Sequence, residues 1–588
     1  MRITTSLLLL LSFFALRCSQ TPATSVPPPN VILIITDDQG YGDFGFMGNP
    51  LIETPNVDQL ASESALMERF YVSPVCAPTR ACLMTGRYNF RTRVVDTWVG
   101  RAQMDPEEIT IAEILGQNGY QTGLFGKWHL GDMHPMRPQD QGFAEVLMHR
   151  GGGIAQPSEP IENARRYTDA ILWHNGQQIQ SEGYCTDVYF DYAEEFIRSS
   201  TRDKKPFFAY IATNAPHGPF HDVPEELRQK YMSKDLIPLV QGEVKDSAQA
   251  QDRLARIFAM IENVDQNIGE LRATLKELAI EDNTLILFMV DNGPNSMRYV
   301  GSLRGMKTGI HDGGIRSPLL AHWPKQIKAG HRNDRISAHI DLLPTIVEAA
   351  GQRIPTGHNL DGKSILPLLT GPTPTDWAER HLFIQAQRGD VPSKRAHFAV
   401  IGQDYKLLHD TGFGNQRQPF EEVPYELYQV SSDPGEQNNL AESDPERTAA
   451  MLQMYDDWFA DVSSTRPDNY AKPPIFLGTA AEPNAHLTWQ DWEQITPGRG
   501  WGRQGRWYID VKEPSTFAVE VIARDTISDW NVRLEIGTQT WDAQASGRKR
   551  RVMIPEVKLD KGPAVVMGYI DDGVDEVLGP YQLIFRKL

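Results

Sequence analysis

Three apolar runs recur along the first half of the chain, at residues 31–35, 207–211 and 284–290. Continuous apolar runs of this length are typical of strands that are buried on both faces of a sheet. Between the last two runs, apolar residues over 252–280 recur at spacings of one, three and four, which predicts the longest helix of the chain. A shorter amphipathic helix is predicted over 110–120. The alternation of strands and helices indicates an α/β fold.

Oxygen-bearing side chains follow two of these strands directly. Asp37 and Asp38 follow the first strand, and Asp291 and Asn292 follow the third. In an open α/β sheet, ligands bind at the carboxyl ends of the strands. Adjacent carboxylates repel each other unless water or a cation neutralises them, although a solvated loop is the simpler interpretation of an Asp-Asp pair. Only hard oxygen donors are present, which favours calcium or magnesium over zinc, and calcium accommodates this many protein ligands more readily.

The stretch 74–86, PVCAPTRACLMTG, combines a cysteine, a proline and an arginine at fixed spacing. If Cys76 lies near the start of a helix, Pro78 falls in its first turn, where a missing N–H costs nothing. Arg80 then lies one turn further along on the same side, and the helix N-terminus beside it favours an anion. A lone cysteine is usually a small buried apolar residue, but that interpretation leaves the proline and the arginine unexplained.

Further basic residues lie in loop-like segments. Lys127 and His129 are two residues apart in GLFGKWHLG (123–131), so on an extended segment they would face the same way. His217 lies just past the predicted strand 207–211, and Lys307 lies in the glycine-rich stretch 303–318. Alone, Lys127 or His129 would as readily be a surface residue or a satisfied core residue, and a loop histidine between prolines such as His217 is usually inert.

The C-x-P-x-R stretch resembles the signature of the type I sulfatases, members of the alkaline-phosphatase-like superfamily. The GKWHLG wording at 126–131 and the segments 303–318 and 338–351 are similar to the same family. The resemblance runs from about residue 30 to about residue 461. It implies a sulfatase-like central mixed sheet flanked by helices, followed by a small antiparallel C-terminal subdomain.

The resemblance also implies the chemistry of the site. Cys76 would be oxidised by a formylglycine-generating maturation enzyme to formylglycine (3-oxoalanine), whose hydrate is the nucleophile and a ligand of one calcium ion. The other metal ligands would be Asp37, Asp38, Asp291 and Asn292.

The same resemblance gives roles to the basic residues. Arg80, Lys127 and Lys307 would neutralise the sulfate. His129 would assist the release of sulfate, and His217 would protonate the departing alcohol, a role that suits an imidazole.

The pattern changes after the catalytic domain, which we place at 30–370. Short strands and a helix predict the small C-terminal subdomain over 371–465, and a proline-containing linker follows at 466–484. Residues 485–588 alternate between short strands and turn residues, which predicts an accessory all-β, sandwich-like domain. The strands expected there are at 507–511, 517–522, 532–536, 565–570 and 581–585. The basic run 548–551 with Trp501, Trp507 and Trp541 would suit a sulfated chain, but a solvated strand edge and core tryptophans are the simpler interpretation.

The N-terminus predicts export. Residues 1–17 read as a signal peptide whose apolar run is too short to span a membrane, and 18–29 read as a tether. Cys18 is a candidate lipid-anchor site, although Arg17 takes the place of the small residue usual there. We therefore expect a periplasmic or cell-surface protein. Its other cysteines, Cys76, Cys82 and Cys185, form no disulfide framework.

The chain has 588 residues and a formal net charge of −18, which argues against nucleic-acid binding. An anion site would be a local basic pocket in an acidic background. We expect a hydrolase that removes sulfate from a sulfate monoester, with a sulfated carbohydrate as substrate. The alternatives are a phosphonate monoester or phosphodiester hydrolase of the same superfamily, an inactive carbohydrate-binding homologue, and a chain whose Cys76 stays a thiol.

Overall fold

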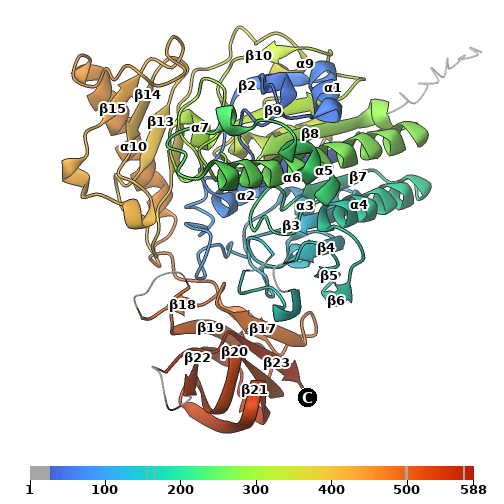
Figure 1. Cartoon of the computed structure of the whole chain (residues 1–588), viewed down its shortest axis with the longest axis vertical. Coiled ribbons are helices and arrows are strands. Elements are labelled where there is room, and N and C mark those ends of the chain that lie inside the picture. The colour runs from blue at the N-terminus through green and yellow to red at the C-terminus, as the bar shows by residue number, and fades with distance from the viewer. Residues whose placement is uncertain (1–26, 155, 164–165, 497–500, 572, 574–576) are drawn as a thin grey trace, which may run out of the picture.

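The computed structural model describes residues 27–154, 156–163, 166–496, 501–571, 573 and 577–588. The predicted signal peptide and Cys18 lie outside this part. The described chain forms a large α/β unit, a small antiparallel unit beside it and a sheet-rich unit at the C-terminal end (Figure 1). No helix among the described residues is long and apolar enough to cross a membrane.

The three predicted central strands are confirmed and are neighbours. They are β1 (Asn30–Thr36), β7 (Phe207–Ala212) and β8 (Thr284–Val290), and both β7 and β8 run parallel to β1. Over the residues described, the sheet has eleven strands. Its order is β10 (Arg332–Asn333), β2 (Ala65–Tyr71), β9 (Arg316–His322), β8, β1, β7, β3 (Gln121–Lys127), β4 (Glu145–His149), β5 (Ile171–His174) and β6 (Gln177–Gln180), with β11 (Ser337–Ala338) beside β2.

The register brings the carboxyl ends of the parallel strands to one edge. Thr36 pairs with Val290, and Ala212 pairs with both Ile35 and Gly126. The residues that follow β1, β7 and β8, and the last residue of β3, therefore gather at that edge.

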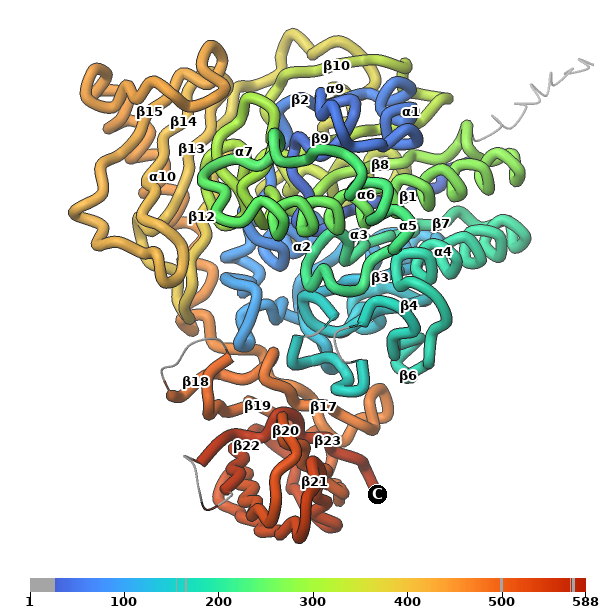
Figure 2. The backbone as a smooth tube through the Cα atoms, viewed as in Figure 1, coloured from blue at the N-terminus to red at the C-terminus, as the bar shows by residue number. Residues whose placement is uncertain are grey.

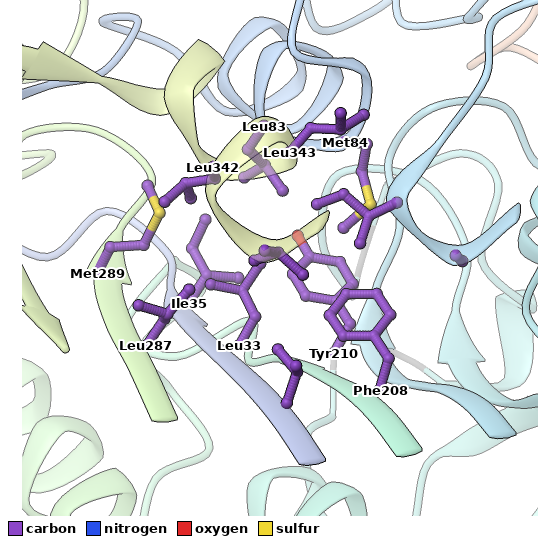
Figure 3. Close-up of a cluster of buried hydrophobic side chains, with 14 of the residues drawn as sticks. Leu33, Ile35, Leu83, Met84, Phe208, Tyr210, Leu287, Met289, Leu342 and Leu343 are labelled. Atoms are coloured by element: carbon purple, nitrogen blue, oxygen red, sulfur yellow. The ribbon is translucent and has the colours of Figure 1, made fainter. Parts of the chain in front are cut away.

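Helices cover both faces of the sheet. Leu33 and Ile35 of β1 face a cluster that includes Leu83 of α2 and Leu342 of α8, as Figure 3 shows. Ile32 and Ile34 face the opposite cluster. The first face carries α2 (Cys76–Thr85), α3 (Ile111–Gln117) and α8 (Leu342–Ala349), and the second carries α1 (Pro55–Glu63), α4 (Cys185–Arg202) and α6 (Ser247–Glu277).

The predicted helices are also confirmed. The predicted long helix 252–280 corresponds to α6, which begins earlier because Asp246 accepts a hydrogen bond from the backbone N–H of Gln249 and caps it. Thr110 and Glu113 form a capping box at the start of α3. The remaining helices of the α/β unit are α5 (Glu225–Met232), α7 (Asp312–Ile315) and α9 (Leu366–Thr370).

The small unit is an antiparallel sheet packed against one helix, as expected. Its strands are β12 (Leu382–Gln385), β13 (Phe398–Ile401), β14 (Lys406–His409) and β15 (Glu426–Tyr428), and its helix is α10 (Pro445–Ser464). The rings of Phe398 and Tyr455 stack with centroids 3.6 Å apart between sheet and helix.

The sheet-rich unit differs in detail from the expectation. The predicted strands 517–522 and 532–536 are the two ends of one long strand, β20, which pairs with an unpredicted strand, β21. The elements of this unit are β16 (Ile475–Leu477), β17 (Asn484–Thr488), β18 (Glu493–Gln494), β19 (Gly505–Val511), β20 (Ser515–Ile536), β21 (Gln539–Leu559), β22 (Gly562–Asp571) and β23 (Gln582–Lys587). β16 lies inside the predicted linker and pairs with β19. Trp507 is fully buried in the core of the unit, so it is a core tryptophan and not part of a substrate-binding surface.

Candidate active site

The C-x-P-x-R stretch opens α2. Val75 is the extended N-cap residue, Cys76 is the first helical residue, and Pro78 lies in the first turn. The Sγ of Cys76 is buried 3.5 Å from Oδ1 of Asp37. Burial and the Asp37 carboxylate raise the pKa of the Cys76 thiol to about 12. As a thiol, residue 76 would stay protonated and be a poor nucleophile near neutral pH.

The two aspartates after β1 each contact a lysine. Lys127 Nζ donates to Asp37 Oδ2 at 2.5 Å, and Lys307 Nζ donates to Asp38 Oδ1. Burial would raise the pKa of both carboxyls, but the surrounding cations together, led by Lys127 for Asp37 and by Lys307 for Asp38, outweigh it and lower both. Asp38 has a φ of 61°, a conformation that costs energy and that clusters at functional sites. Both aspartates are therefore ionised in the fold.

The residues after β8 complete the acidic group. Asp291 Oδ1 accepts a hydrogen bond from the backbone N–H of Asp38 at 3.1 Å, and Asn292 Nδ2 donates to Asp38 Oδ1 at 2.8 Å. Burial and Asp37 raise the pKa of Asp291 to about 7. The Oδ1 of Asn292 is buried and has no hydrogen-bond partner. An unpaired buried amide oxygen beside carboxylates suits a cation.

A compact set of possible metal ligands forms around these residues. One atom each from Asp37, Asp38, Cys76 and His217 lies within 4.8 Å of the others. Two of these four donors are carboxylate oxygens, and Asp291 and Asn292, which both contact Asp38, add further oxygens of the kind that calcium and magnesium prefer. The residues present thus fit a hard divalent cation.

Three cationic side chains converge on Cys76 and the aspartates. Arg80 is fully buried, and its guanidinium donates to Asp291 Oδ2 at 2.9 Å and to the carbonyl of Lys127 at 3.0 Å. Lys307 Nζ lies 3.4 Å from Cys76 Sγ. Arg80, Lys127 and Lys307 therefore gather at the site as expected, but each is paired with a carboxylate, so the three cations balance the acidic residues there rather than leaving a net basic pocket.

The segment that carries Lys307 is shaped by close backbone packing. A Cβ on Gly314 would lie 2.2 Å from the carbonyl oxygen of Gly309 and 2.5 Å from that of Met306. The prediction that the stretch 303–318 is loop-like is only partly correct, because the short helix α7 begins at Asp312. Arg304 donates to the carbonyl of Glu436 and Arg316 to the carboxylate of Asp312, so both contact the fold around the site.

His129 corrects one expectation. β3 ends at Lys127, and His129 has a φ of 61°, so the two side chains do not lie on one extended segment. The His129 Nε2 donates to the carbonyl of Thr97 at 2.8 Å, while its Nδ1 is buried without a partner. Burial, with Lys127 nearby, keeps the pKa of His129 well below its ordinary value. His129 is thus a neutral imidazole with an unpaired acceptor nitrogen.

His217 follows β7 and faces the aspartates. Its Nδ1 donates to the carbonyl of Gly218 at 2.6 Å, and its Nε2 lies 3.7 Å from Asp38 Oδ2. Burial lowers the pKa of His217, although Asp38 and Asp37 oppose this. Because its pKa is lowered, His217 becomes protonated only at a lower pH than an ordinary histidine does.

Some residues at the site carried no signal in the sequence. Asn295 donates to Asp38 Oδ2 at 3.3 Å, and Thr79 Oγ1 donates to the carbonyl of Asp291 at 2.7 Å. The guanidinium of Arg80 donates to the hydroxyl oxygen of Tyr210 at 3.5 Å. Thr79 sits at a variable position of C-x-P-x-R, and Tyr210 reads as an ordinary core residue of a strand. Only their spatial neighbours reveal them.

Comparison with known proteins agrees with this geometry. A family model described as sulfatase matches residues 29–352, and one described as N-sulphoglucosamine sulphohydrolase, C-terminal, matches residues 306–458. Human arylsulfatase A is 30% identical over 73% of this chain and 87% of its own length. The chain therefore belongs to the sulfatase family and is a sulfuric ester hydrolase.

One bacterial relative and one solved structure extend the comparison. The N-acetylglucosamine-6-O-sulfatase of Bacteroides thetaiotaomicron is 27% identical over 74% of this chain and 87% of its own. The crystal structure of Ps i-CgsB in complex with a neocarrahexaose is 29% identical, with a TM-score of 0.62 over 73% of this chain and 92% of that one. The mixed sheet and the antiparallel subdomain are thus the sulfatase fold.

Proposed function

We propose that this enzyme removes sulfate from a sulfated carbohydrate. The observation that carries the proposal is Cys76 at the start of α2, between the aspartates and three buried or half-buried cations. An anion as compact as sulfate suits three converging cations. The carbohydrate part is supported by relatives whose names specify amino-sugar sulfates and by a relative solved with a carrageenan-type oligosaccharide.

We further propose that Cys76 acts as formylglycine. The raised pKa of the thiol supports this, because an unconverted Cys76 would remain protonated. Once converted and hydrated, residue 76 supplies one hydroxyl that attacks sulfur and a second that later expels sulfate. A formylglycine-generating enzyme would act on the chain before it matures.

A calcium ion is the proposed metal. Asp37, Asp38, Asp291 and Asn292 would hold it with the converted residue 76, and it would polarise the sulfate. The unpaired Oδ1 of Asn292 and the cluster of carboxylate oxygens support a hard cation.

The other side chains act on charge and protons. Arg80, Lys127 and Lys307 neutralise the sulfuryl oxygens as charge develops there. The unpaired Nδ1 of His129 accepts a proton when sulfate is released. His217, in its protonated form, donates to the departing alcohol.

Location and domain roles belong to the same proposal. The predicted signal peptide supports export, and Cys18 remains the candidate lipid anchor. We assign 30–370 to catalysis and 371–465 to the small subdomain. The linker at 466–484 and the accessory domain at 485–588 follow, with β16 of the linker region joining the sheet of the accessory domain.

Turnover measurements test this function. The matured enzyme should release sulfate from sulfated oligosaccharides and hydrolyse an aryl sulfate much faster than an aryl phosphate diester. The reverse order would favour the phosphonate and phosphodiester alternative. Absence of turnover in enzyme whose Cys76 is fully converted would favour the inactive homologue.

A further inference from the structure

The loop at 96–101, which lies after α2, connects His129 to the sheet-rich unit. In Figure 2 this light-blue segment runs down toward the C-terminal strands. The carbonyl of Thr97 accepts two hydrogen bonds, from His129 Nε2 at 2.8 Å and from Gln490 Nε2 at 3.0 Å. Gln490 is buried and lies just past β17, so a residue of the sheet-rich unit and the proposed proton acceptor share one carbonyl.

Three more contacts hold this loop to the same unit. The backbone N–H of Gly100 donates to the carbonyl of Gln490 at 2.7 Å. Lys472 Nζ donates to the carbonyl of Val99 at 2.7 Å and to that of Trp492 at 3.0 Å. The Val99 side chain is itself part of the apolar core of the sheet-rich unit.

The backbone of this loop needs such support. Val99 has a φ of 46°, a strained conformation that a β-branched residue adopts only when its surroundings impose it. The contacts that surround Val99 come from Lys472, from Gln490 and from the core of the sheet-rich unit. That unit therefore helps to hold the Thr97 carbonyl, together with Arg388 of the small unit, which donates to Thr97 Oγ1 at 3.0 Å.

We propose that Gln490 is a positioning residue for His129 and that the sheet-rich unit serves catalysis as well as any binding of substrate. A carbonyl accepts only, so the Thr97 carbonyl fixes the proton of His129 on Nε2 and leaves Nδ1 as the acceptor. Gln490 donates to the same carbonyl and so helps to hold it in place. The benefit of this arrangement for catalysis rests on the proposed role of His129. The hydrogen bonds of Thr97 to His129 and Gln490 are observed whatever that role is.

The test compares Gln490→Met with Gln582→Met. Gln582 is a matched control, because it is also buried in the sheet-rich unit and donates to carbonyls of the α/β unit, those of Pro157 and Glu159, each at 3.0 Å. Full-length protein labelled with ¹⁵N-histidine reports the His129 tautomer, and the His129 signals are those absent from His129→Gln. A thermal melt establishes that each variant is folded.

We expect a single tautomer protonated on Nε2 in the unsubstituted protein and in Gln582→Met, and exchange between tautomers in Gln490→Met. In matured enzyme, kcat of Gln490→Met should fall about tenfold with little change in KM. An unchanged His129 signal in Gln490→Met, or equal changes in both variants, would overturn the proposal. The ¹⁵N spectra need no substrate, so they decide the positioning even if the enzyme proves to have a different activity.

Discussion

The Sγ of Cys76 and the Oδ1 of Asp37 lie 3.5 Å apart in a buried site. Burial and the carboxylate together hold the thiol in its protonated form. Removing the charge of Asp37 should therefore lower the pKa of Cys76, since the nearby lysines would no longer be balanced. In unconverted Asp37→Asn protein, alkylation of Cys76 by iodoacetamide should reach its half-maximal rate at a lower pH than in the parent.

Mass spectrometry of the Cys76 peptide measures this alkylation, and Cys76→Ala gives the background from Cys82 and Cys185. A pH dependence that does not move in Asp37→Asn would mean that the carboxylate does not control the thiol.

His217 should matter most for poor leaving groups. His217→Ala is expected to slow sugar sulfates by about 10²–10⁴-fold and an aryl sulfate much less, because an aryl alcohol departs without a proton. Burial lowers the pKa of His217, so its acid form is lost as pH rises through that lowered value. Turnover of sugar sulfates should accordingly decline with rising pH in the parent enzyme and not in the variant. Equal losses on both substrate types would remove His217 from this role.

The loop that carries Lys307 should be sensitive to one methyl group. In Gly314→Ala, the new Cβ would meet the carbonyl oxygens of Gly309 and Met306, which are backbone atoms and cannot move alone. We expect a loss of about 1–3 kcal/mol in stability and a loss of activity toward that of Lys307→Met. Steady-state kinetics and thermal melts measure both effects.

Gly371→Ala is the matched control for this substitution, because nothing lies within 4 Å of its Cβ and its φ of −165° is extended. Full activity in Gly314→Ala would show that the packing of Gly314 does not place Lys307.

His339 should make the fold sensitive to acid. Its Nε2 donates to Ser73 Oγ and its Nδ1 accepts from the backbone N–H of Ile340, so it is neutral, and burial lowers its pKa to about 3. Between about pH 6.5 and 3 the unfolded chain binds the proton and the folded chain does not, so stability falls as pH falls through this window.

His339→Gln should be less stable than the parent near pH 7 but should lose less stability on acidification, by a few kcal/mol. Urea unfolding at pH 7 and pH 4 measures the difference, with the exposed His221→Gln as control. Parallel losses in parent and His339→Gln would assign the acid sensitivity to other groups.

The sequence predicts the framework of the site because apolar runs define β1, β7 and β8. Once these strands are parallel neighbours, Asp37, His217 and Asp291 must gather at one edge. The helix of C-x-P-x-R follows from local rules, since a proline in the first turn and the left-handed Gly86 that ends the helix need no tertiary partner.

The remaining features depend on distant parts of the chain. The turn that places His129 lies between Gly126 and Gly131, but the left-handed conformation that reorients the side chain falls on His129 itself, which the sequence does not indicate. The bond between Gln490 and Thr97 joins residues 393 positions apart. The middle of β20, residues 524–531, is rich in polar residues that read as a turn, and only pairing with β21 makes it a strand.

The chemistry proposed for this site depends on Cys76 working as an aldehyde. Mass spectrometry of the Cys76 peptide, taken from enzyme with measured sulfatase turnover, detects that aldehyde. We predict that the peptide carries the lighter formylglycine form, in a fraction that rises in proportion to kcat when a formylglycine-generating enzyme is co-expressed. Full turnover by protein in which every Cys76 is still a thiol would contradict the account.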